Sequence, residues 1–300
     1  MNKEQNFISS VVFLSDNSSL NLAFFQKLYN CLDEHFQQFE MVAIADGSTS
    51  AAVSQLREWA KTINKPLTII RMSLRQPHEQ CMNAGLDCSI GDYIYEFDSV
   101  EMPYDPHLIW QAYELAQQGN DIVTVCPEKE RWASKAFYSV FNANSHAAYE
   151  LRTNAFRLVS RRALNRVHAI SENLPYRKAA YAACGLKMAE LEFPGEYRGN
   201  KHERYSLAAD SLVLYTDFGY KFSLGFTALM ILITLAELIY TLVVWLAGHP
   251  IAGWTTTMFV ITFGMTGLFA VMAILLKYLT LILKITFKKQ SYLIESIEKM

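Results

Sequence analysis

An acidic side chain at position 46 follows an apolar, strand-like run and could bind a ligand. Asp46 comes directly after residues 40–45 and is followed by Gly47 and Ser48, which favour a tight turn into a helix. A carboxylate here can accept hydrogen bonds from a nucleobase or from ribose hydroxyls, and the exposed helix N-terminus favours a phosphate. The same residues also make an ordinary capped turn, so this motif alone leaves both interpretations open.

A second pair of acids, Asp98 and Glu101, stands at the end of another strand-like segment, residues 91–98. Carboxylates at such an edge can hold a hard divalent cation, Mg²⁺ or Mn²⁺, which would neutralise the diphosphate that leaves a nucleotide sugar. The alternative is that Asp98 only begins a loop and that Glu101 is solvated.

Several basic side chains stand where they could contact the same ligand. Arg75 and His78 belong to the loop and helix that follow a third strand, where either residue could equally be a cap or a surface group. Arg157 lies inside the apolar run 155–159, which is a further predicted strand, and a charge in such a strand needs a partner or a ligand. A basic cluster before the first long apolar run could bind a membrane-borne phosphate or simply attract anionic headgroups. Its members are Arg198, Lys201, His202 and Arg204.

Strand-like and helical segments alternate through the first half of the chain. The strand-like runs are residues 8–14, 40–45, 67–72, 91–98 and 121–125, and the helical ones are 20–36, 50–63, 78–88 and 106–118. This alternation is typical of βαβ units and predicts an α/β, Rossmann-like fold with a mainly parallel sheet. Ligands of such sheets gather at the carboxyl ends of the strands, so the loops at Ser15, Asp46, Arg75 and Asp98 are expected to meet.

Two apolar runs, residues 222–247 and 254–285, each exceed the ~20 residues that cross a bilayer core. The short loop between them predicts a hairpin of two transmembrane helices. Lys and Arg flank the outer ends and are absent from that loop, so the positive-inside rule places both termini in the cytoplasm. The N-terminus shows no pattern of a cleaved signal peptide, which agrees with this orientation. We therefore expect a multi-pass protein of the inner (cytoplasmic) membrane.

This pattern divides the chain into four parts. They are a cytoplasmic domain of residues 1–200, a basic interfacial segment of residues 201–221, the hairpin of residues 222–287 and a cytoplasmic tail of residues 288–300. The overall composition, 51% hydrophobic with a net charge of −2, averages the apolar hairpin and the polar domain. The five cysteines show no metal-ligand or redox spacing and are expected to be buried apolar fillers in a reducing compartment.

Taken in order, the motifs resemble the membrane-anchored family 2 glycosyltransferases of GT-A fold that act on polyprenyl phosphates. Bactoprenol glucosyltransferases and dolichol-phosphate mannose synthases belong to this group, and the likeness extends over nearly the whole chain. The motifs are Val11-Val-Phe-Leu, Ala45-Asp-Gly-Ser-Thr, His78 with Ala84-Gly-Leu-Asp, the run from Gly91 to Asp98, Phe156-Arg-Leu with Ser160-Arg-Arg, the basic stretch 198–206 and Ser291-Tyr-Leu-Ile-Glu.

The resemblance implies a role for each candidate residue. Asp98 and Arg157 would be catalytic, and Asp98 with Glu101 would hold Mg²⁺ or Mn²⁺. The nucleotide sugar, expected to be a UDP-sugar, would be bound by Ser15, Asp16, Asp46, Arg75 and His78. The phosphate of a polyprenyl phosphate acceptor would be held by Arg198, Lys201 and Arg204. The resemblance further implies cell-envelope glycan synthesis or modification, O-antigen among its products, and a tendency to form homo-oligomers; no nucleic-acid partner is expected.

This sequence departs from the family pattern at the acidic site. Ser15-Asp-Asn replaces the family's Tyr-Asn-Glu, Ala45 replaces the first acid of the nucleotide loop, and Val100 replaces the second acid of the metal motif. Ala155 stands where the family has an acid before Phe-Arg-Leu. Two hypotheses follow: an active transferase in which Glu101 or Asp105 completes the cation site, and a catalytically inactive subunit or scaffold for another membrane glycan enzyme or flippase.

Overall fold

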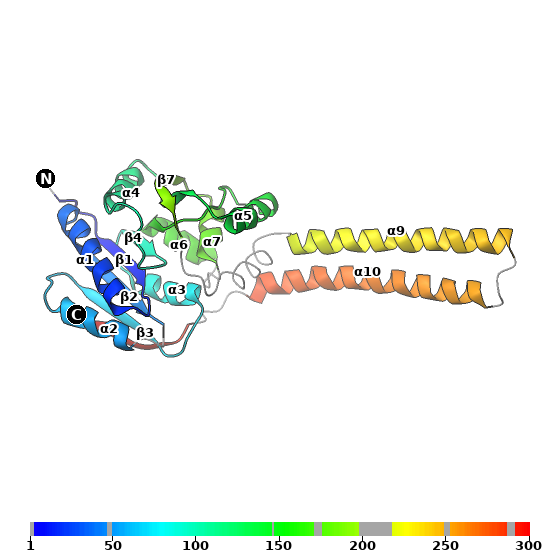
Figure 1. Cartoon of the computed structure of the whole chain (residues 1–300), viewed down its shortest axis with the longest axis horizontal. Coiled ribbons are helices and arrows are strands. Elements are labelled where there is room, and N and C mark those ends of the chain that lie inside the picture. Colours follow the sequence, from blue (N-terminus) through cyan, green and yellow to red (C-terminus); the bar gives the residue numbers. More distant parts are fainter. Residues whose placement is uncertain are drawn as a thin grey trace. The chain divides into compact units, whose positions relative to one another are not determined.

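The computed structural model describes residues 3–46, 50–145, 147–170, 176–197, 218–248, 253–286 and 292–300. The chain divides into two compact units, of which one holds Met1–Ser211 together with Lys288–Met300 and the other is Leu212–Phe287. Figure 1 shows a sheet flanked by helices in the first unit and two long helices in the second. The chain therefore leaves the first unit and returns to it at its C-terminal end.

An eight-stranded mixed sheet of order β7-β5-β6-β4-β1-β2-β3-β8 forms the centre of the first unit. Strand β1 pairs in parallel with β2 and β4, β2 with β3, and β5 with β7, whereas β6 and β8 are antiparallel to their neighbours. The predicted α/β fold with a mainly parallel sheet is confirmed. The strands are β1 Ile8–Phe13, β2 Phe39–Ala45, β3 Leu67–Met72, β4 Tyr93–Phe97, β5 Ile122–Lys129, β6 Phe156–Ser160, β7 Met188–Glu196 and β8 Ile294–Lys299.

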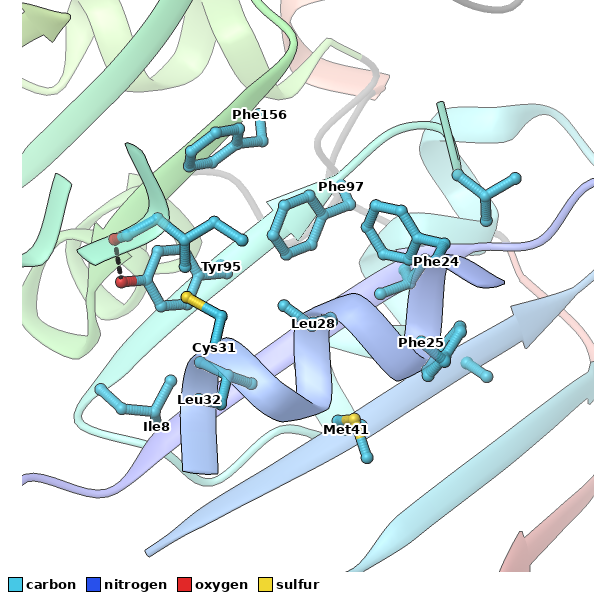
Figure 2. Packing of buried hydrophobic residues seen from close by; sticks show 14 of the residues in the cluster. Ile8, Phe24, Phe25, Leu28, Cys31, Leu32, Met41, Tyr95, Phe97 and Phe156 are labelled. Carbon is cyan, nitrogen blue, oxygen red and sulfur yellow. Dashed lines mark hydrogen bonds between the residues drawn. The ribbon is translucent and has the colours of Figure 1, made fainter. Parts of the chain in front are cut away.

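Helices cover both faces of this sheet because alternate strand residues are apolar on each side. Buried residues of α1, α2 and α4 pack on one face, and buried residues of α3, α6 and α7 pack on the other. Figure 2 shows the first layer, where Phe24 and Leu28 of α1 lie over Tyr95 and Phe97 of β4. The helices of this unit are α1 Ser18–His35, α2 Ser50–Ala60, α3 His78–Cys88, α4 His107–Gln117, α5 Trp132–Asn144, α6 Arg161–Ile170 and α7 Arg177–Ala183.

Gly85 lets α3 approach the sheet closely. A Cβ atom at this position would lie 2.5 Å from Ile44 Cδ1 and 2.6 Å from Val11 Cγ1, both side-chain atoms of the sheet. Such distances are far inside van der Waals contact, so a larger residue would push the helix outward. Because α3 carries His78 and Glu79 at its first turn, this close packing also sets the height of the candidate site above the sheet.

Two strands were not anticipated by the sequence pattern. Strand β7 has mostly exposed or half-exposed positions, so it lacks the apolar run that identifies a buried strand. Strand β8 lies within the tail of residues 288–300, where Ile and charged residues alternate, and it pairs with β3 at the edge of the sheet. The tail is therefore part of the first unit rather than a separate extension.

The second unit consists of α9 Phe218–Ala247 and α10 Trp254–Thr286, which pack against each other. Within them, Leu224–Leu246 and Trp254–Leu279 are long and apolar enough to cross a membrane. Only 11% and 6% of these segments is buried inside the protein, which is unlike the core helices of a soluble domain. They are candidate transmembrane helices. The Thr266 hydroxyl donates to Thr234 Oγ1 at 3.3 Å, a polar contact between the two helices.

Candidate functional site

The carboxyl ends of β1, β2 and β4 lie at one edge of the sheet and bring three of the predicted loops together. Val12 is opposite Phe97, and Phe13 is opposite Ile44, so the residues that follow these strands leave the sheet side by side. Asp98 follows β4 directly, and Asp46 follows β2 directly. This edge is the place where a parallel sheet of this kind binds ligands.

Arg75 and His78 reach this edge from the loop between β3 and α3. The Nε atom of Arg75 lies 3.6 Å from Asp46 Oδ2, with the arginine side chain 67% exposed and the aspartate side chain 16% exposed. His78 Nε2 is 3.0 Å from the backbone oxygen of Asp98, and its ring packs on Phe13. The structure thus places His78 against the Asp98 backbone.

Ser15 and Asp16 lie in the loop between β1 and α1. Asn21 Oδ1 accepts hydrogen bonds from the backbone and hydroxyl of Ser15 at 2.9 and 3.1 Å, and the Asn21 amide donates to the Ser15 carbonyl at 2.9 Å. Asn17 caps α1 by accepting from Ser19 N and Leu20 N. Ser15 therefore holds its own turn in place, while the side chain of Asp16 is exposed.

Asp98 is paired with two buried arginines through both of its carboxylate oxygens. Arg177 Nη2 donates to Asp98 Oδ1 at 2.6 Å, and Arg157 Nη2 donates to Asp98 Oδ2. The side chains of Arg157 and Arg177 are 1% and 0% exposed, whereas that of Asp98 is 23% exposed. Asp98 is therefore the member of this group that solvent, and hence a ligand, can reach.

Arg177 also connects two further buried carboxylates to Asp98. Its Nε donates to Glu79 Oε2 at 2.8 Å, and its Nη1 donates to Glu96 Oε2 at 2.5 Å. Glu96 additionally accepts from the Tyr181 hydroxyl and lies 3.4 Å from Arg157 Nε. The group formed by Glu79, Glu96, Asp98, Arg157 and Arg177 is called the ionic cluster below.

The charges of the ionic cluster determine how Asp98 titrates. Burial alone raises the pKa of the Asp98 carboxyl, but the attraction of Arg157 and Arg177 outweighs this and holds the pKa well below its usual range. The same ion pairs keep the pKa of both guanidinium groups raised in spite of their burial. The Asp98 carboxylate and the two guanidinium groups thus remain charged at neutral pH.

Two donor atoms of Arg157, Nε and Nη1, make no hydrogen bond in the part of the chain that the structure describes, although Nε lies 3.4 Å from Glu96 Oε2. Both atoms are buried. Arg157 also lines a narrow recess between β5, β7 and α7, with a free volume of about 20 Å³. Arg152, Lys178 and Glu190 line the same recess. A buried donor without an acceptor is costly, so Nη1 is suited to an anionic ligand.

The residues around Asp98 do not form a ready site for a divalent cation. Each Asp98 oxygen is already paired with a guanidinium group. Glu101 is exposed, and its backbone N–H donates to Ser99 Oγ. Asp105 Oδ1 accepts from the His107 backbone at the start of α4, and Val100 is buried in the core. Among the described residues no three His, Cys, Asp or Glu side chains converge as metal ligands would. A cation at Asp98 would therefore have to displace a guanidinium group and take further ligands from the substrate.

The sequence pattern indicates some residues of this site but not others. Arg157 was found because a charge interrupts an apolar strand, and its partner Asp98 was found as the acid that ends β4. Arg177, Glu79 and Glu96 were missed. The same signal was present, since Glu96 stands between Tyr95 and Phe97, and Arg177 begins an alanine-rich helix. The three predicted acceptor-phosphate residues, Arg198, Lys201 and Arg204, lie outside the described residues.

Comparisons with known proteins agree with this geometry. The family model of glycosyl transferase family 2 matches residues 22–185. An uncharacterized glycosyltransferase of Synechocystis sp. is 24% identical over 69% of this chain and 69% of its own length. A prophage bactoprenol glucosyl transferase homolog of Escherichia coli is 26% identical over 60% of this chain and 63% of its own length.

A solved structure shares the fold. It is a mannosyltransferase of Pyrobaculum calidifontis in complex with GDP-mannose and Mn²⁺, with a TM-score of 0.52 and 16% identity over 70% of this chain and 63% of that one. The chain thus spans about two thirds of the lengths of these relatives. At this level of identity the structural likeness concerns the fold.

Proposed function

Because the chain belongs to glycosyl transferase family 2, we propose that it moves a sugar from a nucleotide donor to the phosphate of a membrane-borne polyprenyl phosphate. The observation that carries this proposal is the pairing of a solvent-reachable acid, Asp98, with a buried arginine whose Nη1 lacks an acceptor. An acid at the end of a strand, with a cationic hydrogen-bond donor beside it, suits a site in which two phosphate-bearing substrates react. The relative named as a bactoprenol glucosyl transferase homolog supports a lipid acceptor.

The donor would lie at the carboxyl ends of β1 and β2. Asp46 is positioned to accept hydrogen bonds from a base or ribose, and the exposed Arg75 beside it offers a cation for the diphosphate. We propose a UDP-sugar as donor. Ser15 and Asp16 border this region, and Ser15 contributes by fixing the turn rather than by a free hydroxyl.

The acceptor phosphate would approach from the side of Arg157. Arg157 Nη1 would donate to a phosphate oxygen, with Lys178 of the same recess as a second cation and Arg198, Lys201 and Arg204 as further candidates. An ionised phosphate oxygen attacks the anomeric carbon, the bond from that carbon to the diphosphate breaks, and the nucleoside diphosphate leaves with the electron pair. Because the phosphate nucleophile is already anionic, no side chain has to activate it, and the reaction relies on positioning the two substrates. The alanine at position 155, where the family pattern has an acid, is compatible with this reaction.

The candidate transmembrane helices support a reaction at a bilayer. A polyprenyl acceptor keeps its phosphate at the headgroup level, so a transferase tethered by Leu224–Leu246 and Trp254–Leu279 works where its acceptor is. The Lys and Arg at the outer ends of the hairpin support the cytoplasmic leaflet. Lipid-linked sugars made there would serve cell-envelope glycan synthesis or modification, O-antigen included. A homo-oligomer and a Mg²⁺ or Mn²⁺ cofactor remain predictions.

A second candidate function is a catalytically inactive partner of another membrane glycan enzyme or flippase. The observation that favours it is the occupation of both Asp98 oxygens by guanidinium groups, together with Ala45 and Ala155 at positions where the family pattern has acids. Such a protein would keep the fold and the anchor, since neither depends on those acids.

A measurement of nucleotide binding at the donor site distinguishes the transferase from the inactive partner. Titrating UDP and GDP into the full-length protein in nanodiscs by calorimetry is expected to show UDP binding. Asp46→Asn should weaken UDP affinity about tenfold, because a charge-assisted hydrogen bond contributes ~1.5 kcal/mol or more. Glu114→Gln, which changes an exposed acid of α4, should leave the affinity within about twofold. Absence of binding to either nucleotide would contradict the proposed transferase.

A further inference from the structure

Strand β8 lies next to the loop that carries Arg75 and His78, although more than 200 residues separate them in the sequence. Ser73 N and Ser73 Oγ each donate to the Leu293 carbonyl at 3.1 Å. Gln76 Nε2 donates to that same carbonyl at 2.7 Å, and Leu293 N donates to Gln76 Oε1 at 2.9 Å. The residue just before β8 therefore holds both ends of the Gln76 side-chain amide.

The Gln76 amide depends on this contact. The residue is 8% exposed, and among the hydrogen bonds found for its side chain both are to the Leu293 backbone. If the tail moved away, a buried donor and a buried acceptor would lose their partners together, which is unfavourable. The loop and the tail are thus expected to be ordered together.

The same loop contacts the candidate site on either side of Gln76. Arg75, one residue before, reaches Asp46, and His78, two residues after, reaches the backbone oxygen of Asp98. A shift of Gln76 would displace both of these contacts. A movement of the tail would therefore displace Arg75 and His78 through its contact with Gln76.

The far part of the tail is anchored independently. Arg57 of α2 forms a bidentate pair with Glu298, with Nε–Oε2 at 2.8 Å and Nη2–Oε1 at 2.5 Å. Arg71 Nη2 lies 3.5 Å from Glu295 Oε2. These contacts attach β8 to the sheet edge without involving the Gln76 loop.

We propose that the strand after the second apolar helix positions the nucleotide-binding loop, with Gln76 as the positioning residue that couples the two. Only residues 287–293 separate α10 from β8 in the sequence. The second unit is therefore followed directly by the segment whose Leu293 contacts Gln76. This inference rests on the proposed function, because it assigns the loop of Arg75 and His78 to the donor.

Gln76→Ala tests the coupling in the full-length protein in nanodiscs. UDP affinity, measured by calorimetry, is expected to fall about tenfold. The reason is that a small displacement of the groups that contact a ligand weakens its binding. Amide hydrogen exchange of residues 73–78 and 292–293 should accelerate together. Glu298→Gln is the matched control, since it weakens the same strand at its other end; it should speed exchange in β8 and leave UDP affinity within about twofold.

A second variant changes only the tail. Leu293→Pro removes the N–H that donates to Gln76 Oε1, and it leaves every residue of the loop in place, so it should lower UDP affinity in the same direction. If Gln76→Ala does not fold, Leu293→Pro tests the coupling between the tail and the loop in its place. UDP affinity equal to that of the parent in a folded variant of either kind would overturn the coupling while leaving the proposed function intact. An equal loss in Glu298→Gln would reduce the effect to general destabilisation and also overturn it. A parent protein that binds no nucleotide would overturn the proposed function, and this inference with it.

Discussion

Replacing Arg177 with methionine is expected to lower the free energy of unfolding of the first unit by about 3–5 kcal/mol, the cost of removing one partner from a buried ion pair. The Arg177 side chain is 0% exposed and donates to Glu79, Glu96 and Asp98. Without it, three acids would face Arg157 as their only guanidinium partner within the ionic cluster. Chemical denaturation of the detergent-solubilised protein, followed by tryptophan fluorescence, measures this loss.

Arg152→Met is the matched control for this experiment. Arg152 also pairs with two acids, Glu190 and Glu192, but its side chain is 31% exposed and its partners are 37% and 50% exposed. Solvent screens such pairs, so the loss should stay below about 1 kcal/mol. Similar losses in the two variants would contradict the view that the ionic cluster is a buried core of the site.

Asp98→Asn is expected to lower the rate of sugar transfer by about 10²–10³-fold, the range found when a preorganised charge is removed from a reaction centre. The carboxylate fixes the guanidinium groups of Arg157 and Arg177 through one oxygen each. An amide presents an NH₂ group to one of the two, so the cation that would meet the acceptor phosphate is no longer held in place. Initial rates at saturating donor measure the effect.

Glu101→Gln serves as the comparison for Asp98→Asn. Glu101 is the other acid predicted to hold a cation, and its side chain is exposed. We expect the transfer rate to stay within about twofold of the parent at every Mn²⁺ concentration, as for a surface substitution. If Glu101→Gln instead raised the Mn²⁺ concentration needed for half-maximal rate, the predicted cation site at Asp98 and Glu101 would be supported against the arrangement described above. A parent-like rate in Asp98→Asn would remove Asp98 from the mechanism.

The sequence was informative about the sheet because its central strands are buried on both faces. Ile8–Phe13 and Phe39–Ala45 are entirely buried, and such runs are recognisable without a partner in view. Strand β8 alternates half-exposed and exposed residues at a sheet edge. Its stability comes from pairing with β3 and from Arg57, partners more than 200 residues away, so no local pattern could predict it.

The sequence predicted the positions of Asp46 and Asp98 but not the contacts that Asp98 makes. Asp46 and Asp98 were located because they end strands of a parallel sheet, which is a property of topology. That Asp98 binds two arginines could not be read from the sequence, since Arg177 comes from a helix after β6 and joins the acids only through tertiary packing. The same contact changes the expectation for a cation, because carboxylate oxygens already paired with guanidiniums are poor preformed metal ligands.

Formation of a lipid-linked sugar is the most direct measurement of the proposed activity. The full-length protein in nanodiscs containing polyprenyl phosphate would be incubated with labelled UDP-sugars, with and without Mn²⁺, and the lipids extracted into organic solvent. We predict labelled lipid with the parent protein and a reduction of about 10²-fold or more with Asp98→Asn. No labelled lipid from the parent with any UDP- or GDP-sugar would contradict the transferase and favour the inactive partner.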